Sequence, residues 1–182
     1  MVLLDSNVFI FSKNQFYSPS FCPGFWEALD LLYKKGKWCS LDKIYDELAE
    51  KNIKKGNQNA KEDYVSQWVK DRRSCFREFD AADELREIIS YLDDEMNLRR
   101  YDAYQVDLFL SGADPYLIAY AMKHGFELIT NETYTNEEKY NNPNNKLKIK
   151  IPNVCKKFGV SYKMLWKFLQ DNDDIVNLVQ NV

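Results

Sequence analysis

Four acidic positions along the chain have residue types that could do chemistry together: Asp5, Asp114, Glu132 and either Asp46 or Glu47. Carboxylates held close together repel one another unless a cation neutralises them, so their convergence would require a metal ion. Oxygen ligands without a convergent Cys or His select hard ions, which here means Mg²⁺ or Mn²⁺. Such ions bind phosphate oxygens and activate water at neutral pH, so phosphodiester hydrolysis is the leading expected chemistry.

The elements around these acids place three of them at one edge of a predicted sheet. Asp5 follows a short apolar run that is typical of a buried strand turning into a helix. Asp114 is expected to be the N-cap of a helix with Pro115 at its first position. That helix precedes a strand at 126–130, and Glu132 lies just past the strand. A helix leading into a parallel strand starts at the carboxyl edge of that strand, so all three acids are expected at the same edge.

The fourth acid comes from a predicted helix at 42–51 that follows the second predicted strand. At about 100° per residue, Glu47 flanks Ile44 on one side of the apolar stripe. Asp46 flanks Ala49 on the other side. Spacing alone leaves either carboxylate as the candidate.

Alternating strands and helices predict an α/β protein with a mainly parallel sheet covered by helices on both faces. The length of 182 residues and the 45% hydrophobic content suit a single domain at 1–182, with a core at 2–169 and a frayed tail at 170–182. The predicted strands lie at 2–4, 38–41, 75–79, 126–130 and 147–151. The predicted helices lie at 6–13, 25–33, 42–51, 64–69, 81–92, 101–110, 115–124, 153–158 and 162–169.

The composition argues against several classes of protein. A net charge of −3 does not fit a uniformly basic nucleic-acid binder, but it leaves open a local basic groove within an acidic protein. A zinc site of the usual spacing is not expected, because His124 is the single histidine and the cysteines form no CxxC pair. The cysteines are expected to be reduced, as in a cytoplasmic protein: Cys22, Cys39, Cys75 and Cys155. The sequence has no signal-peptide pattern and no apolar run of membrane-spanning length, so no membrane partner is expected.

The acidic motifs occur in an order and at a spacing that resemble a known family. They lie at 5–7, 44–48, 114–121 and 128–132. Together they resemble the motifs of the PIN-domain family, the fold of many VapC-type toxin ribonucleases. Further stretches are similar to a subgroup of longer, uncharacterised PIN-like proteins, and they lie at 12–17, 23–26 and 150–155.

This resemblance implies a three-layer α/β/α sandwich and a metal-dependent endoribonuclease that hydrolyses RNA. It assigns the helical acid to Glu47, so that Asp5, Glu47, Asp114 and Glu132 would be metal ligands and catalytic residues. It also implies the toxin of a toxin–antitoxin pair, restrained by an antitoxin protein from a neighbouring gene, and it allows a homodimer. The chain departs from the family pattern at Glu132, where Asp is commoner. It departs again at Asn153, which stands where some relatives carry Asp and is left out of the ligand set.

Other residues are expected to support the site or the core. Ser6 and Asn7 are expected to orient the Asp5 loop, with Asn7 as a second-layer or weak metal ligand. Lys13 is the first candidate for a phosphate contact, although a solvated face is favoured for most of the basic set: Lys13, Arg72, Arg73, Lys146, Lys148 and Lys150. Three tryptophans lie in apolar patterns that favour the core over base stacking: Trp26, Trp68 and Trp166.

Two other functions compete with the ribonuclease. One is a phosphatase that uses Asp5 as a covalent nucleophile, which ranks low because Asn7 replaces the second Asp that such enzymes carry two residues later. The other is a catalytically dormant PIN-like module that binds RNA or protein. Asp5 would then be an ordinary turn residue, and Asp114 would only stabilise its helix, by about 0.5–2 kcal/mol.

Overall fold

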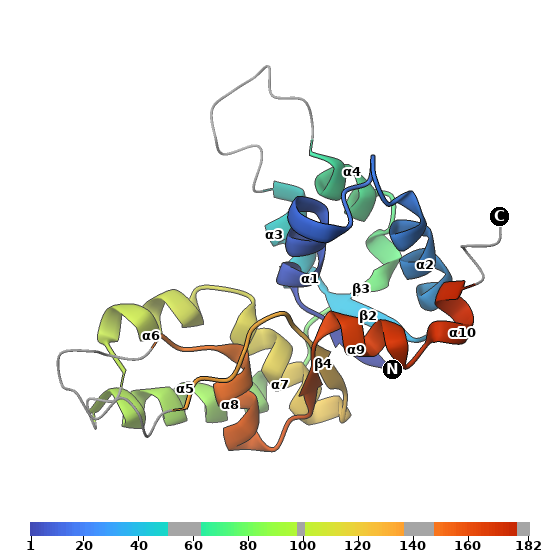
Figure 1. Ribbon diagram of the computed structural model, residues 1–182. Coiled ribbons are helices and arrows are strands. Elements are labelled where there is room, and N and C mark those ends of the chain that lie inside the picture. The colour runs from blue at the N-terminus through green and yellow to red at the C-terminus, as the bar shows by residue number, and fades with distance from the viewer. Residues whose placement is uncertain (51–62, 98–100, 137–147, 178–182) are drawn as a thin grey trace. The chain divides into compact units, whose positions relative to one another are not determined.

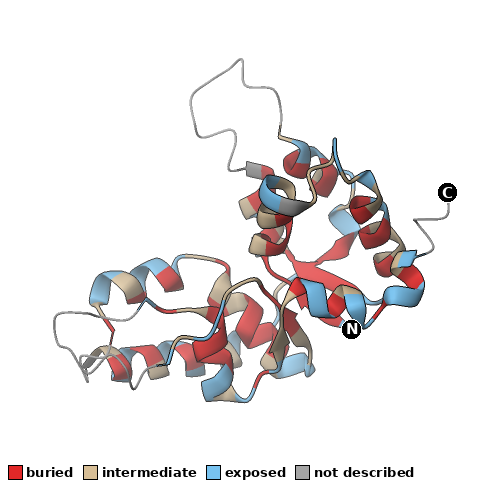
Figure 2. Cartoon of the chain, viewed as in Figure 1, coloured by how far each residue is buried: buried red, intermediate tan, exposed pale blue. Residues whose placement is uncertain are grey.

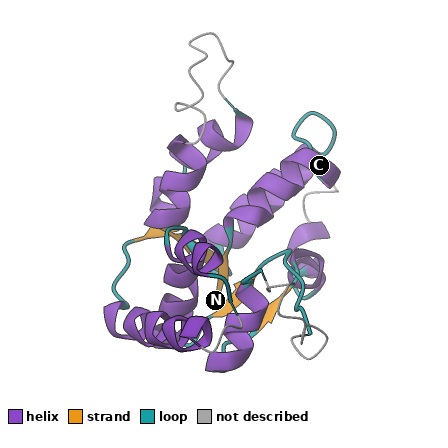
Figure 3. Cartoon of the chain, turned by 90° about the vertical axis from the view of Figure 1, so that its left-hand side faces the viewer, coloured by secondary structure: helices purple, strands orange, loops and turns teal. Residues whose placement is uncertain are grey.

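Five short strands form the sheet in the computed structural model, which describes residues 1–50, 63–97, 101–136 and 148–177. All five are parallel and lie in the order β3-β2-β1-β4-β5. Helices flank the sheet and make up most of the described chain (Figure 3), which confirms the predicted α/β class and the three-layer α/β/α sandwich. The strands are β1 (Val2–Leu4), β2 (Trp38–Leu41), β3 (Phe76–Arg77), β4 (Glu127–Ile129) and β5 (Tyr162–Lys163).

Strand β1 has a special place in this order. From β1 the sheet continues through β2 to β3 on one side and through β4 to β5 on the other. The direction of winding therefore reverses between β1 and β4. In open α/β sheets, ligands bind beyond the carboxyl ends of the strands at such a reversal. The register places Val2 opposite Trp38 and Ser40 opposite Phe76.

The chain divides into two compact units. The first comprises Met1–Glu78, Ile129–Asn131 and Lys163–Val182, and the second comprises Phe79–Leu128 and Glu132–Tyr162. Figure 1 shows β2 and β3 of the first unit surrounded by helices of that unit. These helices are α1 (Ser6–Phe11), α2 (Pro23–Lys34), α3 (Asp42–Glu50), α4 (Tyr64–Lys70), α9 (Leu165–Gln170) and α10 (Asp173–Val176), with a π-helical turn at Ser12–Phe16 and a 3-10 turn at Arg73–Cys75.

An aromatic cluster fills the core of the first unit. The Phe9 ring of α1 lies 6.0 Å from the Trp38 ring of β2 and 5.8 Å from the Trp68 ring of α4, measured between centroids. Trp26 of α2 meets Trp68 at 5.3 Å. Trp26 and Trp38 each donate the indole N–H to a backbone oxygen, so neither loses that hydrogen bond on burial. Strand β2 is buried along its whole length (Figure 2). Strand β1 is also fully buried, and Asp5 is the first residue after it.

The second unit is mainly helical. Its helices are α5 (Ala82–Asn97), α6 (Ala103–Leu110), α7 (Asp114–His124) and α8 (Ile151–Phe158). Helix α7 packs against both α5 and α8. Most of its surface is therefore buried, which agrees with the apolar residues on most of its sides. It ends at Gly125, whose φ of 65° is left-handed and is tolerated best by glycine.

Two predicted elements near the C-terminal end were wrong. A strand was expected at 147–151, but 148–150 has no regular structure and α8 begins at Ile151. Pro152 explains the change, because its fixed φ suits the first turn of a helix and it cannot donate to a strand partner. A helix was expected at 162–169, but Tyr162–Lys163 forms the edge strand β5 and only Leu165–Gln170 is helical.

Helix α9 also corrects one core prediction. Trp26 and Trp68 are buried as expected, whereas the Trp166 side chain is 58% exposed. Leu165 and Phe168 form the buried face of this six-residue helix, so Trp166 points away from it. Of the helices in the described residues, none combines the length and the apolar character needed to cross a membrane.

Candidate active site

Asp5 lies directly after β1, and its side chain is fully buried. Its backbone N–H donates to the carbonyl of Ile129 at 3.1 Å, which joins the end of β1 to the end of β4. It is also the N-cap position of α1, with an extended backbone (φ −77°, ψ 154°). The predicted turn from strand to helix is therefore present, and it lies at the reversal of strand order.

Three neutral donors hold the Asp5 carboxylate. Thr130 donates its hydroxyl to Oδ2 at 2.9 Å, and Asn7 donates its amide to the same oxygen at 3.1 Å. The Ser6 hydroxyl lies 3.4 Å from Oδ1, a long contact. The expectation that Ser6 and Asn7 orient the Asp5 loop agrees with these contacts. Burying a carboxylate is costly unless its charge is hydrogen-bonded, and these donors offset part of that cost.

Thr130 is a site residue that the sequence analysis did not single out. It is fully buried at the end of β4, and its N–H donates to the carbonyl of Lys163 at 3.1 Å. The backbone hydrogen bond to Lys163 holds the main chain of Thr130 in place, and the bond to Asp5 orients its hydroxyl. The feature of the sequence that could have identified Thr130 is its position in the fourth motif. Thr130 directly follows a buried strand, so its hydroxyl lies at the same edge of the sheet as Asp5.

Asn131 follows Thr130 and is a second residue that the sequence left unassigned. Its amide nitrogen Nδ2 is buried and has no hydrogen-bond partner among the described residues. No pattern in the sequence could have indicated this, because it depends on the packing around the loop.

Burial favours Glu47 over Asp46 as the acid of α3. Glu47 is half-buried, whereas Asp46 is exposed, and α3 packs against both α1 and β2 of the same unit. The spacing of apolar residues could not separate the two carboxylates. The assignment of the helical acid to Glu47, which the family resemblance implied, and its role as a metal ligand both stay predictions.

Asp114 is half-buried at the start of α7 in the second unit. It was expected to be the N-cap, but the helix begins at Asp114 itself and Ala113 is the N-cap. Pro115 accordingly occupies the second helical position, where its missing N–H costs nothing. An acid in the first turn still interacts favourably with the positive end of the helix dipole.

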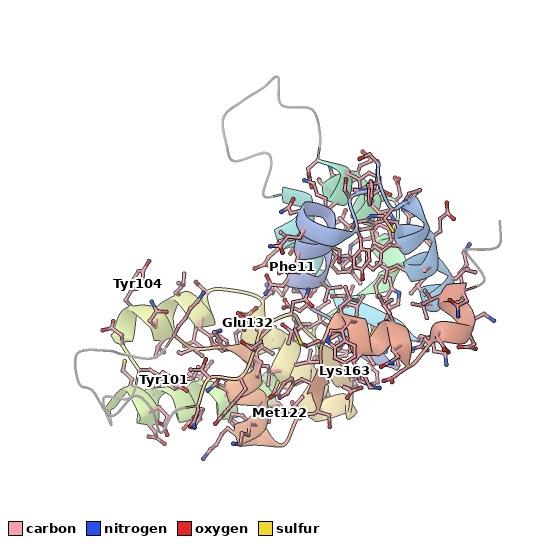
Figure 4. The ribbon with its side chains drawn as sticks, viewed as in Figure 1. Phe11, Tyr101, Tyr104, Met122, Glu132 and Lys163 are labelled. Atoms are coloured by element: carbon pink, nitrogen blue, oxygen red, sulfur yellow. The ribbon has the colours of Figure 1, made fainter. Side chains whose placement is uncertain are left out.

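Glu132 lies after β4, also in the second unit, at the point labelled in Figure 4. Its Oε2 accepts a hydrogen bond of 2.9 Å from the backbone N–H of Ile151, the first residue of α8. The carboxylate thus caps a helix that has no side-chain cap of its own at Lys150. A carboxylate can accept bonds at both oxygens, so capping and metal ligation by Glu132 are compatible.

Three of the six basic residues considered for phosphate contacts bind groups of the protein itself. Lys13 forms an ion pair with Asp63, the N-cap of α4. Arg72 binds Asp30 through two hydrogen bonds of 2.5 and 2.7 Å, which raises the pKa of the guanidinium. Arg73 donates to the carbonyl of Phe76. Lys148 is exposed and Lys150 is half-buried. Lys146 lies outside the described residues.

The chemistry of the donors fits a hard divalent cation. All four predicted ligands offer carboxylate oxygens, and Asp5 has the outer hydrogen bonds that orient a ligating carboxylate. Asp5 and Glu47 belong to the first unit, and Asp114 and Glu132 belong to the second. In the described ranges, no three or more His, Cys, Asp or Glu side chains are grouped so that they could hold a metal ion. The convergence of all four acids therefore stays a prediction.

The fold and the site together define an α/β protein with a buried carboxylate at the reversal point of a parallel sheet. The chain belongs to a family described as a domain of unknown function (DUF4411), whose match covers residues 2–174. Searches of curated proteins and of solved structures each found no match.

Proposed function

We propose that this protein is a divalent-metal-dependent endoribonuclease of the PIN type. The observation that carries the proposal is the fully buried Asp5 carboxylate beyond the carboxyl end of β1, beside the reversal of strand order. A carboxylate there, held by three donors, is costly as a purely structural device and is well placed for a ligand. The resemblance of the four acidic motifs to those of PIN-domain ribonucleases gives independent support.

Each residue has a definite part in this proposal. Asp5, Glu47, Asp114 and Glu132 would hold Mg²⁺ or Mn²⁺, and Thr130 and Asn7 orient the Asp5 carboxylate. When bound, the ion supplies positive charge against the phosphate oxygens and activates water for hydrolysis. The expected setting is a toxin–antitoxin pair whose antitoxin protein is encoded by a neighbouring gene, as the resemblance implies.

The proposal is tested by incubating the purified protein with total RNA, with Mn²⁺ and then with excess chelator. We expect cleavage that the chelator abolishes. The variants Asp5→Asn and Asp114→Asn should each lower the rate by more than about 100-fold, since losing even an outer partner of a metal site costs about 10–100-fold.

Two substitutions on the same helix provide matched controls. Glu47→Gln should be inactive, whereas Asp46→Asn, one residue away and exposed, should keep the rate of the unchanged protein. Circular dichroism and thermal unfolding establish that each variant is folded. Full cleavage in chelator, or full cleavage by both Asp5→Asn and Asp114→Asn, would show that the acids are not the catalytic centre.

A further inference from the structure

The loop that carries Glu132 is hydrogen-bonded to α8 through Asn153 as well as through the Glu132 carboxylate. Asn153, in the first turn of α8, is 5% exposed and faces the backbone of Thr135. Its Oδ1 accepts the N–H of Thr135 at 3.1 Å, and its Nδ2 donates to the carbonyl of the same residue at 2.9 Å. One side chain thus satisfies both backbone groups of Thr135, as a neighbouring strand would.

A side-chain amide is the group that this arrangement requires. An amide offers an acceptor oxygen and a donor nitrogen on the same carbonyl carbon, which matches the backbone N–H and C=O of a single residue. Rotating the amide by half a turn would set NH₂ against N–H and oxygen against oxygen, so the contacts also fix its orientation. An ionised Asp could accept from the N–H but would place its second oxygen against the Thr135 carbonyl.

Other contacts join the same loop to the same helix. The Lys156 ammonium lies 4.5 Å from the centre of the Tyr134 ring and 3.3 Å from its hydroxyl. Glu132 accepts from Ile151 in the first turn of α8, where the positive end of the helix dipole favours a carboxylate. The loop and α8 are therefore linked at Glu132, Tyr134 and Thr135, and the buried Asn153 holds Thr135 through two hydrogen bonds.

We infer that Asn153 is the positioning residue for Glu132, because its amide holds the loop in place and thereby sets the Glu132 carboxylate against the start of α8. This inference rests on the proposed function only for the claim that Glu132 is a metal ligand. In this inference the Asn153 side chain binds the Thr135 backbone and is not a metal ligand.

The positioning role is tested in the full chain without metal, by hydrogen exchange of individual amides in Asn153→Asp and Asn153→Ala. In both variants at pH 7, we expect the protection of the Thr135 and Ile151 amides to fall by about tenfold or more, the equivalent of one hydrogen bond. Amides in α7 should be unchanged. Unchanged protection of Ile151 alongside a loss at Thr135 would overturn the inference, because Glu132 would then be held independently of Asn153.

A pH series separates positioning from a general loss of stability. The Asp introduced at 153 can donate to the Thr135 carbonyl only when it is protonated. Protection of the Thr135 amide in Asn153→Asp, relative to the unchanged protein at the same pH, should therefore return as the pH falls to about 4, the ordinary range of a carboxyl. Asn153→Ala, which cannot donate at any pH, should show no return. Equal pH profiles in the two variants would contradict the requirement for an amide.

A second measurement distinguishes this inference from the proposed function. Titration with Mn²⁺ should show weaker binding by Asn153→Ala, by about 10–100-fold, as for other residues that orient metal ligands. Excess Mn²⁺ should restore much of the RNA cleavage. Altered exchange with unaltered Mn²⁺ affinity would keep Asn153 as the positioning residue of Glu132 but remove Glu132 from the metal site. Unaltered exchange would reject the positioning role whatever the metal data show.

Discussion

At the scale of single residues, the Thr130 hydroxyl is the group that ties the candidate site to the sheet. Thr130 and Asp5 are both fully buried, so their bond of 2.9 Å is shielded from water. A hydrogen bond to a buried charged group contributes more than one between neutral groups, and losing one partner leaves the other poorly satisfied. The Thr130 hydroxyl should therefore contribute measurably to the stability of this edge.

We expect Thr130→Val to lower the free energy of unfolding by about 1–3 kcal/mol, because it keeps the shape of the side chain but leaves the buried Asp5 carboxylate with one donor fewer. Urea unfolding at pH 7 measures this loss. Thr130→Ser, which keeps the hydroxyl and removes only a methyl group, is the matched control and should lose less. Equal losses in the two variants would show that packing, and not the bond to Asp5, stabilises this position.

At the scale of elements, α9 shows how a short helix can hide its buried face from sequence analysis. Six residues make fewer than two turns, so apolar residues at 165, 166, 168 and 169 leave the direction of the core open. The structure buries Leu165 and Phe168 and exposes Trp166. In contrast, α2 has twelve residues and buries Trp26 as its pattern predicts.

This contrast gives a prediction for two tryptophans of the first unit. Trp26→Ala should lower the free energy of unfolding by about 3–5 kcal/mol, because it empties part of the aromatic core. Trp166→Ala should change it by no more than about 0.5 kcal/mol, as for other surface substitutions. Urea unfolding followed by circular dichroism measures both. A loss of several kcal/mol in Trp166→Ala would mean that the Trp166 side chain is packed against the protein.

At the scale of the whole molecule, the burial of each cysteine thiol, and hence its reactivity, shows how far water enters each unit. Cys75 in the first unit and Cys155 in the second are buried, and burial raises the pKa of each thiol to about 12. Burial also raises the pKa of Cys39. Cys22 is half-buried, and all four cysteines are free thiols, as expected from the sequence.

We expect one thiol to react quickly with a small thiol reagent at pH 8 in the native protein, and all four to react in denaturant. The reactive form is the thiolate, which a raised pKa suppresses at pH 8, so Cys39, Cys75 and Cys155 should be protected. Cys22 is less buried than these three, so the reagent should reach it first. Mass spectrometry of the labelled peptides identifies the site. Fast labelling of Cys155 in native protein would show that the second unit opens readily.

Local sequence patterns predicted much of this architecture. The run of apolar residues before Asp5 predicted β1 and the turn into α1, and the alternation of strands with helices predicted a parallel sheet. Gly125 predicted the end of α7. These inferences succeeded because they depend on neighbouring residues, whose periodicity and backbone preferences are written directly in the sequence.

The sequence by itself determined the α/β class and the position of Asp5 after a buried strand. Only the tertiary structure decided that Thr130 binds Asp5, that Glu132 caps α8 and that Asn153 holds Thr135. The first of these bonds joins residues 125 positions apart. Such contacts follow from the order of strands and the packing of loops, and no local preference of either partner specifies them.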